Sequence, residues 1–330
     1  MKSITHNSRI IFSILFFAVT IILSCGDDSK EQTEELKLEG TDAMAYYGRG
    51  LRYQQEGKYD LAIKDYDKAI ELQPDFAEAY NNRGSAYDVK GHYNLAIMDY
   101  TKAIELKPNV ANHYYNRGLT HGHKGLFDSA IEDYTKAIEL SDDYVNAYIN
   151  RGLAYTYLDQ YDRAIKDFTK AIDLKPNDAD VHFKRGASYS CTGQIGLALK
   201  DYTKAIDLKP NFVEAYYNRG TAYLTQGEYD LAEKDFTKAI EINPGDAAAY
   251  CGRGLVYRNK QKYESAIQDY TKAIELNPKF ALAFNYRGDA YYKTGQEDLA
   301  KLDWGTAYAL NHDFPTAPIA RELLGLPEKE

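Results

Sequence analysis

The sequence predicts an all-α protein, an α-solenoid of eight consecutive 34-residue helix-turn-helix repeats. The dipeptide Arg-Gly recurs eight times at intervals of 34 residues, from Arg49-Gly50 to Arg287-Gly288, without an insertion. Aromatic, glycine and alanine residues recur at fixed offsets from this dipeptide, with the spacing of two amphipathic helices. A constant period of this length predicts stacked supersecondary units and overrides the domain count that 330 residues would otherwise suggest.

Residues 1–24 are expected to be a lipoprotein-type signal peptide that lies outside the repeats. Lys2 and Arg9 precede a 14-residue apolar run, Ile10 to Leu23, which is short for a membrane-spanning helix of about 20 residues. The stretch Ile22-Leu23-Ser24-Cys25 resembles the lipobox of bacterial lipoproteins. The resemblance implies that Cys25 becomes the lipid-carrying, palmitoylated first residue of the mature protein. An ordinary cleaved signal, or an uncleaved anchor with Cys25 incidental, is the alternative.

Residues 25–42 are expected to form a flexible, acidic, lipid-anchored linker. The segment from Gly26 to Thr41 is polar, acidic and free of aromatic residues, a composition that cannot bury a core. The whole chain has a formal net charge of −9 and no basic run, whereas phosphate neutralisation supplies most of the affinity for nucleic acid. We therefore expect no nucleic-acid partner. The expected lipid anchor places the protein in the cell envelope, at the periplasmic face of a membrane or at the cell surface.

The repeats are expected to span residues 43–314. With the glycine of each Arg-Gly pair at position 8, units one to eight are 43–76, 77–110, 111–144, 145–178, 179–212, 213–246, 247–280 and 281–314. Positions 20 and 27 are always alanine and position 24 is always aromatic, while positions 4 and 11 are aromatic in seven of the eight units. Glycine at position 15 marks a turn and proline at position 32 ends the second helix, each in six units. An antiparallel pair sets position 4 against 27, 8 against 24 and 11 against 20, each time a large residue against a small one.

This pattern resembles the tetratricopeptide repeat (TPR) family, whose consensus has an aromatic residue, Gly, Tyr, Ala, an aromatic residue, Ala and Pro at these positions. The resemblance covers residues 43–314 and implies a right-handed superhelix whose first helices line a concave groove. Asp142 and His312 replace the closing proline, and Gly122 and Gly196 lie within helices. We expect these departures to reduce local rigidity and to leave the fold unchanged. Residues 315–330 are expected to form a C-terminal capping helix and tail, with the helix around Ile319 to Leu324.

Position 7, which the family usually fills with an apolar residue, is Arg in all eight units, and position 23 is Asp in all eight. The antiparallel register places these positions opposite each other. We interpret them as structural ion pairs, since a partly buried Arg requires a carboxylate; a charged recognition ladder is the alternative. The expected pairs are Arg49 with Asp65, Arg83 with Asp99, Arg117 with Asp133, Arg151 with Asp167, Arg185 with Asp201, Arg219 with Asp235, Arg253 with Asp269 and Arg287 with Asp303.

The sequence offers no catalytic or metal-binding motif. No Walker loop, dinucleotide fingerprint, nucleophile elbow or paired-cysteine zinc spacing appears, so we expect neither an enzyme nor a cofactor. His113, His121 and His123 form a cluster, but residues 121 and 123 point about 200° apart on one helix and cannot share a metal ion. Cys191 and Cys251 lie nearly two units apart and are expected to be free thiols.

The expected binding surface is the groove, which the family lines with positions 2, 5, 6, 9, 12 and 13 of each first helix. An asparagine amide at position 6 offers a donor and an acceptor to an extended peptide backbone, and aromatic neighbours at position 5 add contact area. The row resembles the asparagine ladder in the repeat domain of O-GlcNAc transferase, although Gly48, Lys184, Gly252 and Tyr286 interrupt it. It lacks the paired Lys and Arg of the carboxylate clamp in chaperone-binding repeat proteins. The predicted groove residues are Asn82, Tyr115, Asn116, Ile149, Asn150, Phe183, Tyr217 and Asn218.

These observations predict a non-enzymatic scaffold that holds a protein or peptide partner. A solenoid presents a long open surface and offers no enclosed cleft that excludes water. Two alternatives stay open at this stage. The polar groove residues can merely solvate the surface, and the chain can instead be a structural or assembly accessory subunit of an envelope complex.

Overall fold

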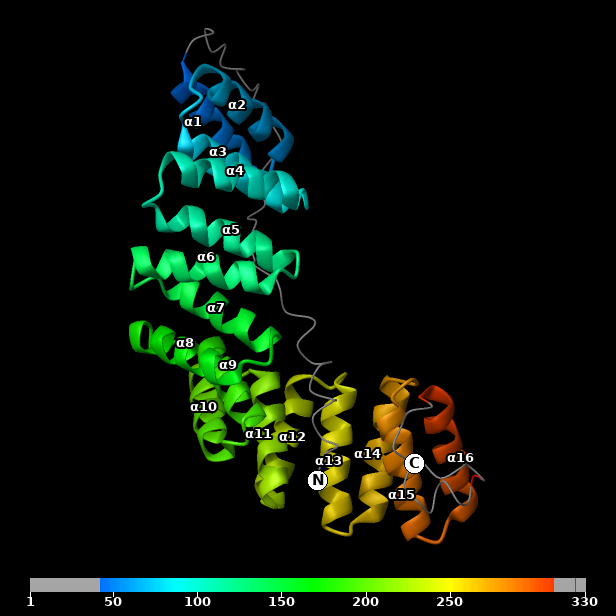
Figure 1. Cartoon of the computed structure of the whole chain (residues 1–330). Coiled ribbons are helices and arrows are strands. Elements are labelled where there is room, and N and C mark those ends of the chain that lie inside the picture. Colours follow the sequence, from blue (N-terminus) through cyan, green and yellow to red (C-terminus); the bar gives the residue numbers. More distant parts are fainter. Residues whose placement is uncertain (1–41, 312–323, 325–330) are drawn as a thin grey trace, which may run out of the picture. The chain divides into compact units, whose positions relative to one another are not determined.

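The structure, a computed structural model, describes residues 42–311 and Leu324. Within that range it contains sixteen α-helices and no strand, with two helices in each unit (Figure 1). This confirms the expected all-α solenoid. The expected signal peptide, the linker as far as residue 41 and most of the expected C-terminal cap lie outside the described residues. The helices are α1 Ala43–Gln55, α2 Tyr59–Leu72, α3 Ala77–Val89, α4 Tyr93–Leu106, α5 Ala111–His123, α6 Phe127–Leu140, α7 Val145–Tyr157, α8 Tyr161–Leu174, α9 Ala179–Cys191, α10 Ile195–Leu208, α11 Val213–Gln226, α12 Tyr229–Ile242, α13 Ala247–Asn259, α14 Tyr263–Leu276, α15 Ala281–Lys293 and α16 Glu297–Leu310.

The turns and helix ends follow from the local sequence. Gly227 closes α11 at position 15 with φ 79°, a left-handed conformation that glycine adopts without a Cβ clash. Units four and seven lack this glycine, and Asp159 and Gln261 take the same conformation with φ 57° and 58°. Second helices end at position 30. The proline at position 32 disfavours a helical conformation of the residue at position 31, which precedes it. Unit three ends at the same position, Leu140, with Asp142 in place of proline.

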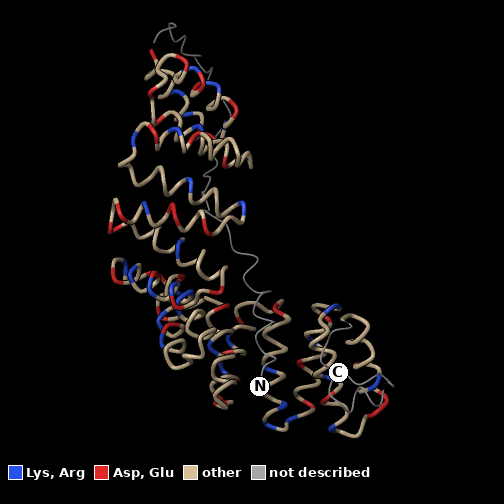
Figure 2. Tube along the Cα trace, viewed as in Figure 1, with Lys and Arg blue, Asp and Glu red and all other residues tan. Residues whose placement is uncertain are grey.

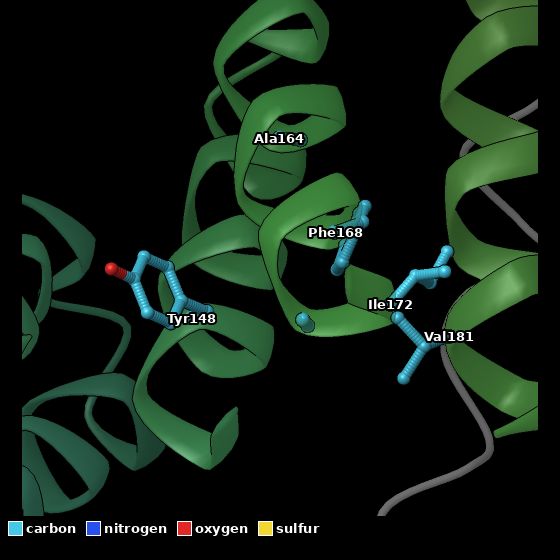
Figure 3. Packing of buried hydrophobic residues seen from close by; sticks show 6 residues of the cluster. Tyr148, Ala164, Phe168, Ile172 and Val181 are labelled. Carbon is cyan, nitrogen blue, oxygen red and sulfur yellow. The ribbon is translucent and has the colours of Figure 1, made fainter. Parts of the chain in front are cut away.

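The core of each unit is a large side chain seated against a small one. A Cβ added to Gly152 would lie only 2.8 Å from Cε1 of Phe168, so the first helix approaches this ring as closely as a glycine allows. Phe168 is fully buried, and Ala164 and Tyr148 belong to the same cluster (Figure 3). Val181 of unit five completes that cluster, which shows that the core continues from one unit to the next.

Units stack through both of their helices. Every second helix packs against the first helix of the following unit. First helices also contact one another, α1 with α3, α3 with α5, α5 with α7, α9 with α11, α11 with α13 and α13 with α15. These contacts join the first helices of units one to four in one row and those of units five to eight in another. We call the surface formed by positions 2, 5, 6, 9, 12 and 13 of the first helices the first-helix face. No helix in the described range has the length and apolar character needed to cross a membrane.

The last unit differs from the others at its outer end. Leu324 packs against the cluster of Ala300 and Trp304 on α16. Its Cδ2 atom lies 3.8 Å from the point where a Cβ on Gly305 would be. Leu324 was expected to help cover this apolar end of the array.

Candidate peptide-binding face

The Arg and Asp of positions 7 and 23 meet in every unit. Arg151 donates from Nε and Nη2 to the two carboxylate oxygens of Asp167, each over 2.8 Å. This forked geometry is the strong form of an Arg–carboxylate contact. The side chains of Arg151 and Asp167 are 16% and 7% exposed, so the pair is largely buried. The structure likewise joins Arg49 with Asp65, Arg83 with Asp99, Arg117 with Asp133, Arg185 with Asp201, Arg219 with Asp235, Arg253 with Asp269 and Arg287 with Asp303.

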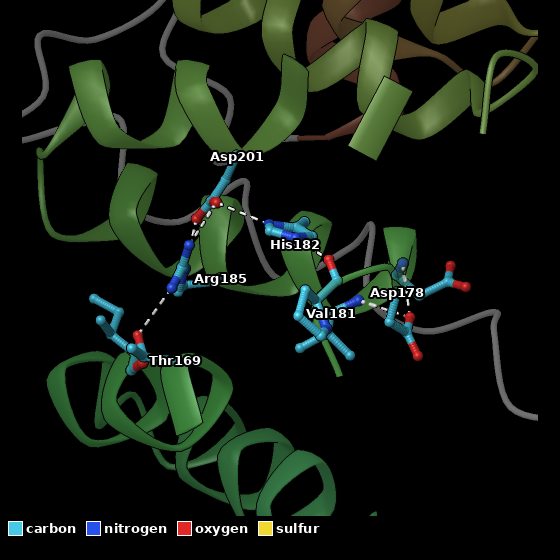
Figure 4. A network of polar contacts seen from close by, with 9 residues as sticks. Thr169, Asp178, Val181, His182, Arg185 and Asp201 are labelled. Carbon is cyan, nitrogen blue, oxygen red and sulfur yellow. Dashed lines mark hydrogen bonds and ion pairs between the residues drawn. The ribbon is translucent and has the colours of Figure 1, made fainter. Parts of the chain in front are cut away.

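Each of these arginines except the first also reaches back into the preceding unit. In Figure 4, Arg185 lies between Asp201 of its own unit and Thr169 of unit four, whose hydroxyl accepts from Nη1 over 3.1 Å. This contact is not among those expected from the sequence, although a threonine recurs at position 25 in units two to seven and was the signal for it. The remaining acceptors at position 25 are Asp67, Thr101, Thr135, Thr203, Thr237 and Thr271. Internal partners thus engage the guanidinium groups on both sides, which favours a structural role over a recognition ladder.

Three asparagines of the first-helix face are held by side chains of the preceding unit. Asn82 donates to the hydroxyl of Tyr47 over 2.8 Å, and Asn150 donates to the hydroxyl of Tyr115 over 2.9 Å. Asn116 donates to the amide oxygen of Asn81 over 3.0 Å. In each case position 6 of one unit donates to position 5 of the unit before it. We call Asn82, Asn116 and Asn150 the braced amides.

The brace uses only part of what each amide offers. An asparagine side chain has two N–H donors and a carbonyl acceptor. Within residues 42–311, the side chains of Asn116 and Asn150 make only the hydrogen bond of the brace. Each therefore retains one N–H and its carbonyl oxygen for a ligand. Asn82 retains less, because its carbonyl oxygen also accepts from Asn81 over 3.1 Å.

The brace stops after unit four. Phe183 stands at position 5 of unit five and has no hydroxyl, so Asn218 donates instead to the backbone oxygen of Glu214 in its own helix, over 2.8 Å. The ring of Tyr217 packs against that of Phe236, with 5.6 Å between the ring centroids. The predicted extension through Tyr217 and Asn218 therefore has a different geometry from the row in units two to four.

The residues predicted at position 5 mostly support the face from beneath. The ring centroid of Tyr115 lies 4.8 Å from that of Tyr144 and 5.9 Å from that of Tyr134. Burial raises the pKa of Tyr115, so its hydroxyl stays protonated at neutral pH. The ring of Phe183 packs on that of Phe212, with 5.0 Å between the ring centroids. Ile149 packs against the cluster around Phe168. These side chains therefore pack against their neighbours in the structure, and their contact with a ligand stays a prediction from the sequence.

The three clustered histidines do not share a partner. His121 lies 3.0 Å from Asp133, and His123 lies 3.2 Å from Asp88. His113 is buried between units with 4% exposure. Across the described part of the chain, no three His, Cys, Asp or Glu side chains converge to hold a metal ion, and Cys191 and Cys251 are free thiols.

A charged depression of about 720 Å³ lies where α11, α12 and the end of α13 meet. Its main charged groups are paired with one another. Lys260 contacts Asp230 at 2.7 Å and Glu233 at 2.6 Å, and Arg219 contacts Asp235. Residues of both charges are interspersed along the described helices (Figure 2). The depression therefore presents mutually neutralised groups.

Comparisons with known proteins agree with the fold and with a surface for protein contact. Residues 77–110, 111–144, 145–178 and 213–246 match the family model described as tetratricopeptide repeat, and residues 236–268 match a second model of that description. Residues 50–88, 192–227 and 254–295 match a model described as TPR repeat. The fold and this face define a solenoid of the kind that contacts other proteins. The chain belongs to the tetratricopeptide repeat family.

Solved structures support the same assignment. The crystal structure of YrrB, described as a TPR protein with an unusual peptide-binding site, is 30% identical with a TM-score of 0.51, over 56% of this chain and 95% of that one. A tetratricopeptide repeat protein from Parabacteroides merdae shares the fold with 20% identity and a TM-score of 0.54, over 79% of this chain and 98% of that one. No curated protein sequence shows significant similarity to the chain.

Proposed function

We propose that this chain is a non-enzymatic scaffold that binds an extended peptide segment of a partner protein on the first-helix face of units two to four. The observation that carries the proposal is the row of braced amides. Holding an amide in place before a ligand arrives reduces the entropy lost on binding. A fixed N–H and carbonyl match the backbone groups of an extended peptide with little regard to its side chains.

The likeness to YrrB supports this proposal, because that protein is described as having a peptide-binding site and is 30% identical over 56% of this chain. The position of the site on the first-helix face is our own inference from the hydrogen bonds of Asn116 and Asn150. The main charged groups of the depression form ion pairs with one another, so the proposal assigns them no catalytic role. It includes no cofactor, metal or nucleic acid.

We also propose that the scaffold is anchored to a bacterial envelope membrane by a lipid on Cys25. The support is the signal-length apolar run that ends at Ser24-Cys25, followed by an acidic segment free of aromatic residues. The anchor would hold the array at the periplasmic face of a membrane or at the cell surface.

A comparison of variants tests the binding site. The full-length protein is crosslinked in cells and purified, and the amount of co-purified partner is measured for the wild type and for Asn116→Ala with Asn150→Ala. We expect at least about a ten-fold loss of the partner, since two hydrogen bonds of about 1 kcal/mol each are removed. Asn94→Ala is the control, because that exposed asparagine lies on the second helix α4, outside the first-helix face, and accepts from Lys124.

A partner retained in full by the double variant would place the site elsewhere than the first-helix face of units two to four. Recovery of a stable stoichiometric complex that ignores these asparagines would support an accessory subunit of an envelope complex instead.

A further inference from the structure

Lys184 stands where the row of asparagines is interrupted. It occupies position 6 of unit five, the position that is asparagine in units two, three, four and six. The residue at position 5 of unit four is Ile149, which offers no acceptor of the kind that braces the neighbouring amides. Lys184 is half-buried on α9, and its ammonium group has no hydrogen bond or ion pair within the described residues.

The carboxylates near Lys184 are already engaged by other groups. Asp178 caps the start of α9 by accepting from the backbone N–H of Val181 over 3.3 Å, as Figure 4 shows, and it lies 3.7 Å from the ammonium group of Lys175. Asp180 lies 3.8 Å from the ammonium group of Lys209. Three lysines thus share two carboxylates, which leaves a local excess of positive charge on a chain whose net charge is −9.

Burial disfavours the charged form of Lys184, and the nearby carboxylates offset this effect only in part. Desolvation lowers the pKa of this lysine and Lys209 adds to the effect, while Asp180 and Asp178 oppose it. The folded protein therefore carries the cost of a poorly solvated cation before any ligand binds. An anionic group that reaches this ammonium group would gain a charge-assisted hydrogen bond, which is about twice as strong as a neutral one.

We propose that Lys184 receives the carboxylate of an aspartate or glutamate side chain of the bound peptide. This proposal rests on the proposed function and specifies its partner. The bound segment has an acidic residue at the point where it passes from the braced amide of Asn150 to α9. A side chain fits better than a terminal carboxylate, because Asn218 on the next first helix offers a further amide to a segment that continues past Lys184.

Selection from a random dodecapeptide library displayed on phage tests the proposal with the full-length protein. The wild type should enrich peptides with Asp or Glu at one fixed place in the aligned sequences. A selected peptide, synthesised with an amidated C-terminus, should bind at least about ten-fold more tightly than its counterpart with Asn or Gln at that place. The Lys184→Met protein should bind the two peptides equally, because it keeps the side-chain length and loses the charge.

Lys170→Met is the matched control, because Lys170 is exposed on α8. This variant should keep the acidic preference. The melting temperature of Lys184→Met should equal or exceed that of the wild type, since an uncompensated cation has been removed, and this result shows that the loss of preference is not a loss of folding.

Two results would overturn the proposal in distinguishable ways. Enriched peptides with no acidic preference, whose binding Asn116→Ala weakens and Lys184→Met does not, would refute the role of Lys184 and leave the peptide-binding scaffold standing. Failure to enrich any peptide would refute the scaffold and the role of Lys184 together.

Discussion

Asn150 and Tyr115 are joined across the boundary between units three and four by a hydrogen bond of 2.9 Å from the amide nitrogen to the phenolic oxygen. The Tyr115 ring is at the same time part of the core, because it contacts Tyr144 and Tyr134. One tyrosine therefore performs two separable tasks, packing through its ring and positioning an amide through its hydroxyl.

Tyr115→Phe should weaken binding of a selected peptide by about 0.5–1.5 kcal/mol, because the amide of Asn150 loses its brace while the ring contacts remain. Isothermal titration calorimetry measures the change. Tyr161→Phe is the control, since that hydroxyl donates to Asp159 in a turn away from the row. Tyr115→Ala should in addition destabilise the array by about 3–5 kcal/mol through loss of the ring. Undiminished affinity of the Phe variant would show that the brace does not position the amide.

Arg151→Ala should destabilise the array by about 3–5 kcal/mol, because it leaves the buried carboxylate of Asp167 without its cation. Thermal unfolding followed by circular dichroism detects the change. Replacing both residues, Arg151→Met with Asp167→Leu, should destabilise the array less than Arg151→Ala alone, since no charge stays buried without a partner. A melting temperature unchanged by Arg151→Ala would mean that the pair contributes nothing to stability.

Two Gly→Ala variants should differ in the sign of their effect. A Cβ at Gly152 would overlap the ring of Phe168, so Gly152→Ala should destabilise the protein by about 1–3 kcal/mol. Gly196 lies in the first turn of α10 with open space around it, so Gly196→Ala should stabilise the protein by up to about 1 kcal/mol. Melting temperatures of the two variants give the comparison, and equal shifts would contradict the close approach of α7 to α8.

Two histidines of unit three should respond to pH in opposite directions. Burial lowers the pKa of His113, so protonation favours the unfolded chain and stability falls as pH decreases below about 6.5. The hydrogen bond to Asp88 raises the pKa of His123. The stabilisation that protonated His123 gives the folded protein is therefore fully present below about pH 6.5 and is lost as pH rises through the pKa of His123 in the folded state. The drop in melting temperature between pH 7.5 and pH 5.5 should be smaller in His113→Ala and larger in His123→Gln than in the wild type. An identical drop in all three proteins would exclude both contributions.

Cys25 remains a prediction from the sequence, because it lies outside the described residues. Cys25→Ser should move the protein from the membrane fraction to the soluble fraction when cells are fractionated. Cys191→Ser is the control, since that exposed thiol lies on α9 and should not affect the distribution. A Cys25→Ser protein that stays with the membrane would disprove lipid anchoring at this residue.

The contacts within a unit were predictable from the sequence. Two helices joined by a three-residue turn have one antiparallel register, so the spacing of Gly152 and Phe168 was enough to place them face to face. The same register gave the pairing of Arg151 with Asp167. These contacts depend only on helical periodicity and on the position of the turn.

The contacts between units were not predictable in this way. The bond from Arg185 to Thr169 depends on how far one unit is rotated and shifted against the next, which the period of 34 residues does not specify. The brace from Asn150 to Tyr115 has the same dependence. Its failure at Asn218 is visible only once position 6 is known to meet position 5 of the unit before, where Phe183 has no hydroxyl.

Gly305 stands at the place in the last unit where units two to seven have threonine. In those units the threonine accepts from the arginine of the next unit, as Thr271 does from Arg287 over 3.0 Å. Because these partners keep fixed offsets, a gene duplication that inserts a whole copy of an interior unit recreates every such bond. A copy added after unit eight would set its arginine against Gly305 and find no hydroxyl. Tandem duplication of an interior unit would therefore keep every bond of this kind, whereas a copy added after unit eight would lack one.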